Sequence, residues 1–258
     1  MTEQPLKVWH DRDGALLRLR LARPKANIVD AAMIAAIDQA LADHLDDRRL
    51  IAVLIDHEGP HFSFGASVQE HMPGQFEAML RGFQAMVLRL VAAPVPVLVA
   101  VRGQCLGGGM EVAIAGNLIF AAPDAQFGQP EIQLGVFAPP ASCILPERMP
   151  RGAAEALLFS GRSIGAEEAH RLGLVHAITP EPEVAALAWF DERLAPLSPS
   201  SLRFAVKAAR FEYVERVRAK AAALETLYLN ELMSSHDAVE GLTAFLEKRP
   251  AKWETGAP

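Results

Sequence analysis

Two glutamates stand in surroundings where a carboxylate could do chemistry. Glu111 follows a glycine-rich segment at 103–110 and precedes an apolar run at 112–115, and Glu131 ends the motif FGQPE at 127–131. Most glutamates are solvated or salt-bridged surface residues. A carboxylate in the first turn of an otherwise apolar helix is instead a partner of the helix dipole or a catalytic group. The sequence leaves these interpretations open, and the two glutamates form a candidate carboxylate pair.

Three consecutive glycines, Gly107 to Gly109, lie directly before this helix. Glycines at a helix start cost stability, because glycine loses the most backbone freedom on folding. The compensating gain is close approach of a ligand to free N–H groups at the positive end of the helix. The spacing is neither G-x-G-x-x-G nor a P-loop followed by Lys-Ser/Thr, which argues against binding of a nucleotide phosphate.

A second segment rich in small residues is FSFGAS at 62–67. Gly65 tolerates unusual backbone angles and Ala66 has little bulk, so the segment could direct a backbone N–H into a cavity. Taken alone, it is more typical of a plain turn.

The sequence His57-Glu58-Gly59-Pro60-His61 matches the zinc-protease pattern H-E-x-x-H. That chemistry needs both histidines one turn apart on a continuous helix, so that both reach one metal. The Gly-Pro pair between them predicts a loop. We therefore expect no metal site here.

The elements that must position these residues alternate through the first two-thirds of the chain. Alternating apolar and charged side chains at 14–21 predict a half-buried strand, and Asp30 is expected to cap a helix. Further strands are expected at 51–56, 95–101 and 118–121, and helices at about 75–91 and from about 108. This order predicts an α/β fold with largely parallel strands.

From about residue 150 the pattern becomes helical. Helices are expected at 152–160, 165–172, 182–195, 199–210, 213–233 and 236–247, and one strand at 174–178. We expect a core at 1–195 and a helical C-terminal region at 196–258 that serves as a lid, an oligomer interface or both.

Composition excludes several classes of protein. The chain has 258 residues, of which 51 % are hydrophobic, enough for one large core. A net charge of −6 argues against a nucleic-acid or anionic-membrane partner. Two cysteines, Cys105 and Cys143, and the lack of an apolar leader favour a cytoplasmic protein.

Four motifs together resemble the crotonase (enoyl-CoA hydratase/isomerase) family, in the order and spacing of that family. They are LARPKAN at 21–27, FSFGAS at 62–67, GQCLGGGMEVA at 103–113 and FGQPEIQLG at 127–135. The resemblance runs over essentially the whole chain. It implies a spiral of repeated ββα units followed by a helical C-terminal region.

The resemblance also implies a mechanism. The thioester oxygen of an acyl-coenzyme A substrate would accept hydrogen bonds from the N–H groups of Ala66 and Gly108, an oxyanion hole that stabilises an enolate-like transition state. Glu111 and Glu131 would hold a water molecule, deprotonate it and return a proton to carbon. No metal or separate cofactor is implied, because coenzyme A is part of the substrate.

Within the family, the chain resembles the subgroup that hydrates a cyclic dienoyl thioester in anaerobic benzoyl-CoA breakdown. Ser67 replaces the acid of ordinary hydratases, and Pro139 and Pro140 replace a glycine-rich turn. Two prolines stiffen this turn, which favours a flat ring over a linear chain. Water would then add in the 1,4 sense. Apolar walls are expected from Phe64, Val136 and Phe137, with Pro139 beside them.

The resemblance further indicates how coenzyme A and neighbouring subunits are bound. The adenosine part is expected along Lys25 and Ala26 and along the backbone of Ala66, Ser67 and Val68, with Phe245, Lys248 and Arg249 as weaker candidates for the phosphate end. A homo-oligomer is expected, a trimer or a dimer of trimers.

Two alternatives remain open on the sequence alone. One is an ordinary enoyl-CoA hydratase/isomerase of fatty-acid or amino-acid breakdown, against which the altered turn at 137–142 argues. The other is a non-catalytic crotonase-fold binding protein that contacts RNA, which the acidic charge and the two glutamates disfavour.

Overall fold

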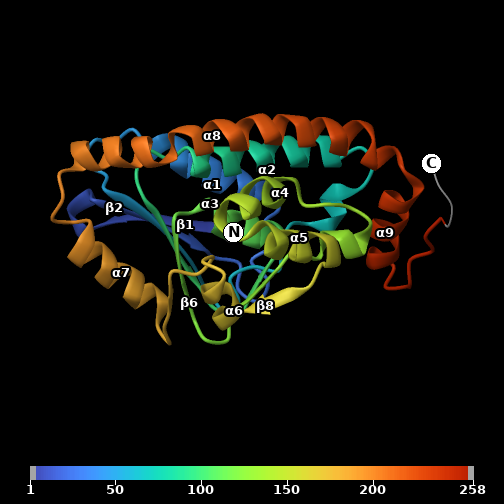
Figure 1. Ribbon diagram of the computed structural model, residues 1–258, viewed down its shortest axis with the longest axis horizontal. Coiled ribbons are helices and arrows are strands. Elements are labelled where there is room, and N and C mark those ends of the chain that lie inside the picture. Colours follow the sequence, from blue (N-terminus) through green and yellow to red (C-terminus); the bar gives the residue numbers. More distant parts are fainter. Residues whose placement is uncertain (1–3, 255–258) are drawn as a thin grey trace.

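The computed structural model describes residues 4–254 and is built on a six-stranded sheet (Figure 1). The strands lie in the order β1 (Leu6–Asp11), β2 (Leu16–Leu21), β3 (Ala52–His57), β4 (Val97–Val101), β6 (Leu118–Ala121) and β9 (Ala177–Ile178). β1 pairs antiparallel with β2, and the other pairs are parallel. The expected α/β fold with largely parallel strands is confirmed.

The central strands are buried on both faces, as their apolar sequences predict. Successive side chains of a strand point to opposite faces. Val53 and Val99 accordingly join the main core on one face, while Leu54 and Leu98 join a second core on the other. β1 was not expected, because it is an edge strand with one buried residue among six and a weak apolar pattern.

Helices cover both faces of this sheet. α1 (Ala31–His44) and α2 (Phe76–Val91) contribute to the main core, and α7 (Pro182–Arg193) contributes to the second. The carboxylate of Asp30 accepts a hydrogen bond from the N–H of Met33 at 2.9 Å. The predicted cap of α1 is therefore confirmed.

A small second sheet carries the motif segments. It consists of β5 (Gln104–Leu106), β7 (Gln126–Gly128) and β8 (Ser163–Gly165). β5 and β7 are parallel, and β8 is antiparallel to β7. α3 (Gly108–Ala115) follows β5 almost directly. Its observed start agrees with the helix expected from about residue 108.

The C-terminal region differs from expectation in one respect. α8 (Pro199–Asn230) is one continuous helix, where two helices at 199–210 and 213–233 were expected. No glycine or proline lies between 200 and 230 to interrupt it. α8 runs along α2, as the long orange helix of Figure 1 shows. The remaining helices are α4 (Pro139–Arg148), α5 (Arg151–Ser160), α6 (Ala166–Arg171) and α9 (His236–Leu246).

The C-terminal region shares the main core with the rest of the chain. Val217, Ala221 and Tyr228 of α8 are buried in that core, and α8 packs against α2 and α4. Within residues 4–254, no helix has the length and apolar character needed to cross a membrane.

Candidate active site

Three chain segments run side by side and end at the same place. Ser63 pairs in parallel with Cys105 of β5, and β5 pairs in parallel with β7. The residues that follow the three segments, Ala66, Gly108 and Glu131, therefore come together. They line a cavity of about 30 Å³. Its lining consists of Ala66, His71, Met79, Leu80, Phe83, Gly108, Glu111, Glu131, Phe137, Ala138, Pro139 and Tyr228.

Ala66 and Gly108 face each other in this lining. A Cβ atom added to Gly108 would lie 3.0 Å from both the N and the Cβ of Ala66. A side chain at this position would be tightly crowded, so glycine allows the backbones of the two residues to lie close together in the lining. A pair of N–H groups at such a position can stabilise a developing oxyanion.

Gly107 is required for a second close approach. Its φ of 49° is unfavourable for residues with a side chain, and an added Cβ would lie 2.5 Å from Oε1 of Glu131. The N–H of Gly107 donates to the carbonyl of Gly128 at 2.9 Å, which ties the start of α3 to the end of β7. The glycine thus lets the backbone pass directly beside the carboxyl group of Glu131.

Glu111 is buried, with 4 % of its surface exposed. Its Oε1 accepts a hydrogen bond from the N–H of Ala141 at 2.8 Å. Burial, and next the charge of Glu131, raise the pKa of Glu111 well above its usual range. A buried carboxyl group with a raised pKa is a candidate for proton transfer.

Glu131 lies in a short 3-10 helix, Pro130–Leu134, and is partly buried. Burial raises its pKa to about 7. The side-chain amide of the buried Gln129, with its nitrogen toward Glu131, donates to Oε2 at 2.9 Å. Two carboxyl groups with raised pKa values in one cavity can act as an acid and a base near neutral pH.

Pro139 and Pro140 do not form the expected rigid turn. They are the first residues of α4, where the fixed φ of proline suits a helix start and its missing N–H removes no helical bond. Both are buried, and Pro139 lines the cavity. The first N–H that α4 can donate is that of Ala141, and this group binds Glu111.

The apolar wall of the cavity differs from the one expected. Phe137 lies in it, but Phe64 and Val136 are not part of the lining. The ring of Phe64 contacts His61 instead, with centroids 4.9 Å apart, and its surface is 44 % exposed. Val136 is buried in the main core. The rest of the apolar wall comes from Met79, Leu80 and Phe83 of α2, which belong to none of the sequence motifs.

Two polar residues of the lining were also missed. His71 is largely buried, its Nδ1 donates to the carbonyl of Ser67 at 2.7 Å, and burial lowers its pKa. Tyr228 reaches the cavity from α8 and is 1 % exposed. Neither residue belongs to a motif, so the sequence carried no signal for its position.

The residues expected to bind coenzyme A fall into two groups. The N–H of Phe64 donates to the carbonyl of Ala26 at 2.9 Å, which brings Lys25 and Ala26 beside the segment that contains Ala66. The φ of Lys25 is 89°, a strained value of the kind that recurs at ligand-binding loops.

The other candidates lie at the start of the 3-10 helix Val68–His71 and at the end of α9. Ser67 and Val68 directly follow Ala66 and are partly buried. Phe245 and Lys248 are exposed, and α9 packs against the 3-10 helix. Arg249 forms an ion pair with Glu240 within the C-terminal segment.

The H-E-x-x-H match does not lie on a helix. His57 ends β3, and His61 lies in the following loop. Nε2 of His57 accepts the N–H of Arg102, and Nδ1 of His61 accepts the N–H of Gln104, both at 3.2 Å. The expected loop is confirmed, and both histidines bind the backbone at the start of β5, at Arg102 and Gln104.

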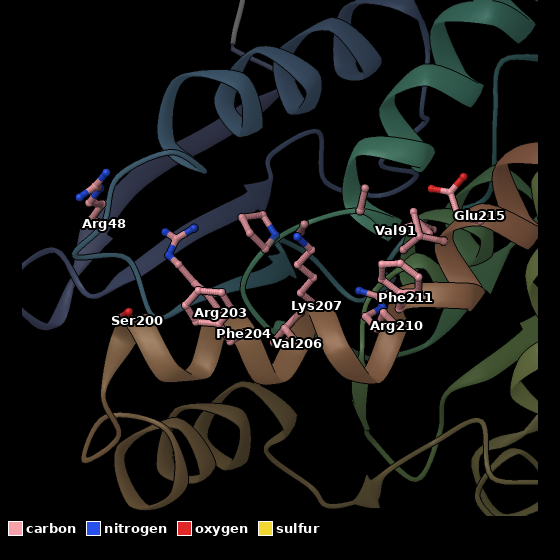
Figure 2. Close-up of a pocket in the computed structure, with 14 residues that line it drawn as sticks. Arg48, Val91, Ser200, Arg203, Phe204, Val206, Lys207, Arg210, Phe211 and Glu215 are labelled. Carbon is pink, nitrogen blue, oxygen red and sulfur yellow. The ribbon is translucent and has the colours of Figure 1, made fainter.

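A larger cavity of about 650 Å³ lies between α8 and the end of α2 (Figure 2). It contains none of the residues expected to do chemistry. Its lining is apolar and basic, with one carboxylate, Glu215. The small cavity is therefore the better candidate active site.

The chain matches known proteins over almost its whole length. The family model described as enoyl-CoA hydratase/isomerase matches residues 11–256. The chain is 66 % identical over 250 residues to a cyclohexa-1,5-dienecarbonyl-CoA hydratase of Thauera aromatica, covering 97 % of each protein. It is 30 % identical to the carnitinyl-CoA dehydratase of Escherichia coli (strain K12), covering 94 % of this chain and 96 % of that protein.

The fold has solved counterparts as well. A crystal structure of an enoyl-CoA hydratase/isomerase from Pseudoalteromonas atlantica T6c superposes with a TM-score of 0.87 at 25 % identity, covering 97 % of this chain and all 100 % of that one. The spiral fold that the motifs implied is confirmed by this likeness.

Proposed function

Because the chain belongs to the enoyl-CoA hydratase/isomerase family, we propose that it adds water to a cyclic dienoyl thioester, cyclohexa-1,5-diene-1-carbonyl-CoA. The product is 6-hydroxycyclohex-1-ene-1-carbonyl-CoA, a step in anaerobic benzoyl-CoA degradation. The observation that carries this proposal is the placement of Glu111 and Glu131 in one small cavity with the backbone of Ala66 and Gly108. The similarity to the Thauera aromatica hydratase supports the choice of substrate.

In the proposed reaction, the carboxylate of Glu131 takes a proton from water while the water oxygen attacks the β-carbon of the thioester. The electron pair passes through the diene to the thioester oxygen, which the N–H groups of Ala66 and Gly108 stabilise. The carboxylic acid of Glu111 then protonates the far end of the dienolate. The assignment of Glu131 as the base and Glu111 as the acid is part of the proposal, and burial raises the pKa of both carboxyl groups, which suits proton exchange near neutral pH.

A product assay over a panel of acyl-CoA thioesters tests this function. We expect the cyclic dienoyl-CoA to be hydrated much faster than crotonyl-CoA. In D₂O, one deuterium should enter the ring carbon opposite the one that carries the hydroxyl group, because addition is 1,4. Faster turnover of crotonyl-CoA would favour an ordinary enoyl-CoA hydratase, and no turnover of any thioester would favour a binding protein.

The proposed enzyme is a homo-oligomer, a trimer or a dimer of trimers, with α8 at an interface. Phe204 and Phe211 lie two turns apart on one face of α8 and are 71 % and 67 % exposed. They border the cavity of Figure 2, where the guanidinium of Arg203 is already bound to the carbonyls of Leu45 and Asp47. An apolar face of this kind suits a second copy of the chain.

Sedimentation velocity tests this assembly. The wild-type chain should sediment as a trimer or hexamer, and a Phe204→Ser/Phe211→Ser variant should dissociate at the same concentration. A wild-type monomer would contradict the proposal. The buried free thiols of Cys105 and Cys143 are compatible with the cytoplasm, where we place the enzyme.

A further inference from the structure

Tyr228 is the residue through which the long helix α8 reaches the active-site cavity. The helix buries only Val217, Ala221 and Tyr228, and Tyr228 lines the same cavity as Glu111 and Glu131. Phenylalanine would fill this position equally well as an apolar side chain. A tyrosine instead places a hydroxyl group in a site with 1 % exposure, and burial of an unpaired hydroxyl is costly.

Among residues 4–254, no group forms a hydrogen bond with the hydroxyl of Tyr228. The ring is held by Phe137, which contacts it edge to face with centroids 5.3 Å apart and planes at 75°. Burial, and next the charges of Glu111 and Glu131, raise the pKa of the phenol. The group therefore stays protonated and acts as a hydrogen-bond donor, not as a base.

The other hydrogen-bond donors around the cavity already bind another group or have another role in the reaction. The N–H of Ala141 binds Glu111, and Pro139 and Pro140 have no N–H. The Nδ1–H of His71 binds the carbonyl of Ser67, and its lowered pKa leaves Nε2 without a proton. Apart from the carboxylic acid of Glu111, whose proton passes to the substrate carbon, the Tyr228 hydroxyl is thus the uncommitted side-chain donor of this lining in the part of the chain that the structure describes.

The reacting water needs such a donor. A buried water molecule typically makes about three hydrogen bonds. An ionised carboxylate only accepts, so it can bind the hydrogen atoms of the water but not its oxygen lone pairs. A donor that occupies one lone pair leaves the other to attack carbon.

We infer that Tyr228 is a further catalytic residue, whose hydroxyl donates a hydrogen bond to the reacting oxygen. That oxygen belongs to water in the substrate complex and to the ring hydroxyl in the product. This inference rests on the proposed hydration reaction. Helix α8 would then have two roles. Its outer apolar face would form a subunit interface, and its Tyr228 would contact the reacting oxygen.

The variant Tyr228→Phe removes the hydroxyl and keeps the ring against Phe137. We expect kcat to fall about 10- to 100-fold, the size of effect that one strong hydrogen bond has. The inhibition constant of cyclohexanecarbonyl-CoA, which has no hydroxyl group, should stay within about two-fold, since that ligand makes no bond to Tyr228. The melting temperature should not fall, because the lost hydroxyl has no protein partner.

Tyr213→Phe is a matched control. Tyr213 is the other tyrosine of the chain, lies on the same helix and contacts Arg210 rather than the cavity. Its variant should retain the wild-type kcat. The inference would be overturned if folded Tyr228→Phe retained more than half of the wild-type kcat. It would also be overturned if the affinity for cyclohexanecarbonyl-CoA fell by the same factor as kcat.

The same measurements separate the inference from the proposed substrate. Both variants are assayed on the thioester that the wild type turns over best, whichever member of the panel that is. If this is a linear enoyl-CoA, the substrate proposal fails, yet a selective loss of kcat in Tyr228→Phe still supports the role of the hydroxyl. If the best substrate is the cyclic thioester and Tyr228→Phe is unimpaired, only the inference fails.

Discussion

The N–H of Ala141 lies 2.8 Å from Oε1 of Glu111, so the start of α4 holds one of the two carboxyl groups of the site. Pro139 and Pro140 determine which residue provides this N–H, because neither proline has one to donate. The positive end of the helix dipole points toward the same carboxyl group. α4 thus shapes the cavity through Pro139 and orients Glu111 through Ala141.

Replacement of either glutamate by glutamine should remove catalysis and keep the fold. In Glu111→Gln, the amide oxygen can still accept the N–H of Ala141, and in Glu131→Gln the volume is retained. Neither amide can exchange the required proton, so kcat should fall about 100- to 10,000-fold. Steady-state kinetics and circular dichroism check this prediction. A variant with most of the wild-type turnover would remove that residue from the mechanism.

Gly108→Val should abolish activity through the oxyanion hole. Its Cβ would lie 3.0 Å from the N of Ala66, and the branched side chain would crowd the thioester oxygen. We expect kcat/KM to fall by at least about 100-fold. Gly152→Val is the control, since a Cβ at Gly152 of α5 meets nothing within 4 Å. Normal kcat/KM in folded Gly108→Val would show that the thioester oxygen binds elsewhere.

The sequence predicted the parts of the site that lie in continuous motifs. The glycine segment at 107–109 and Glu111 could be identified because three glycines before an apolar helix destabilise it unless a ligand approaches there, and the role of Gly108 followed from the resemblance to the family. The parts contributed by isolated residues could not be identified. Tyr228 sits in a helix of mostly exposed residues, and the bond between Ala141 and Glu111 depends on how α4 packs against α3.

The same distinction holds for the fold. β3 and β4 were predicted because strands buried on both faces are continuously apolar. β1 and β8 were not, since an exposed edge strand and a strand of three residues carry little pattern. The sequence predicts a rigid turn at Pro139 and Pro140, whereas the structure places both in the first turn of a helix, to which proline is equally suited.

The raised pKa values of the two glutamates predict how stability depends on pH. A carboxyl group whose pKa is raised on folding binds its proton more tightly in the folded state, so its contribution is lost as pH rises. For Glu131 this window extends from its ordinary value of 4.5 to about 7. The Glu111→Gln/Glu131→Gln variant should therefore gain stability relative to wild type as pH rises from 5 to 8. Urea unfolding of both proteins from pH 5 to pH 8 checks this prediction. A difference in the free energy of unfolding that does not change with pH would contradict it.

Removal of metals should change neither activity nor stability. In His57 and His61, the ring nitrogen that lacks a proton already accepts a backbone N–H, so a neutral ring has no lone pair left for a metal. Dialysis against a chelator should leave kcat and the melting temperature unaltered. Stoichiometric zinc lost together with activity would contradict this expectation.

The two prolines at the start of α4 are expected to make the cavity selective for a ring over a long acyl chain. Pro139 and the flexible side chain of Met79 both line the cavity, and this cavity of about 30 Å³ must open to admit an acyl group. We expect the wall to yield on the side of α2 and to stay fixed at Pro139 and Pro140, whose φ angles cannot change. A flat six-membered ring would fit such a space, whereas a long chain would meet the fixed wall.

Pro139→Gly/Pro140→Gly should therefore relax selectivity rather than slow every substrate equally. Extra methylene groups alone change binding by only about 1–3 kcal/mol, so exclusion of long chains must be steric. We expect the ratio of kcat/KM for the cyclic dienoyl-CoA over crotonyl-CoA to fall about ten-fold or more, and a C10 enoyl-CoA to become a detectable substrate. Pro150→Gly, at the exposed start of α5, is the control and should keep the wild-type ratio. If kcat/KM instead fell by the same factor for all three thioesters, the prolines would serve only to hold Ala141 against Glu111.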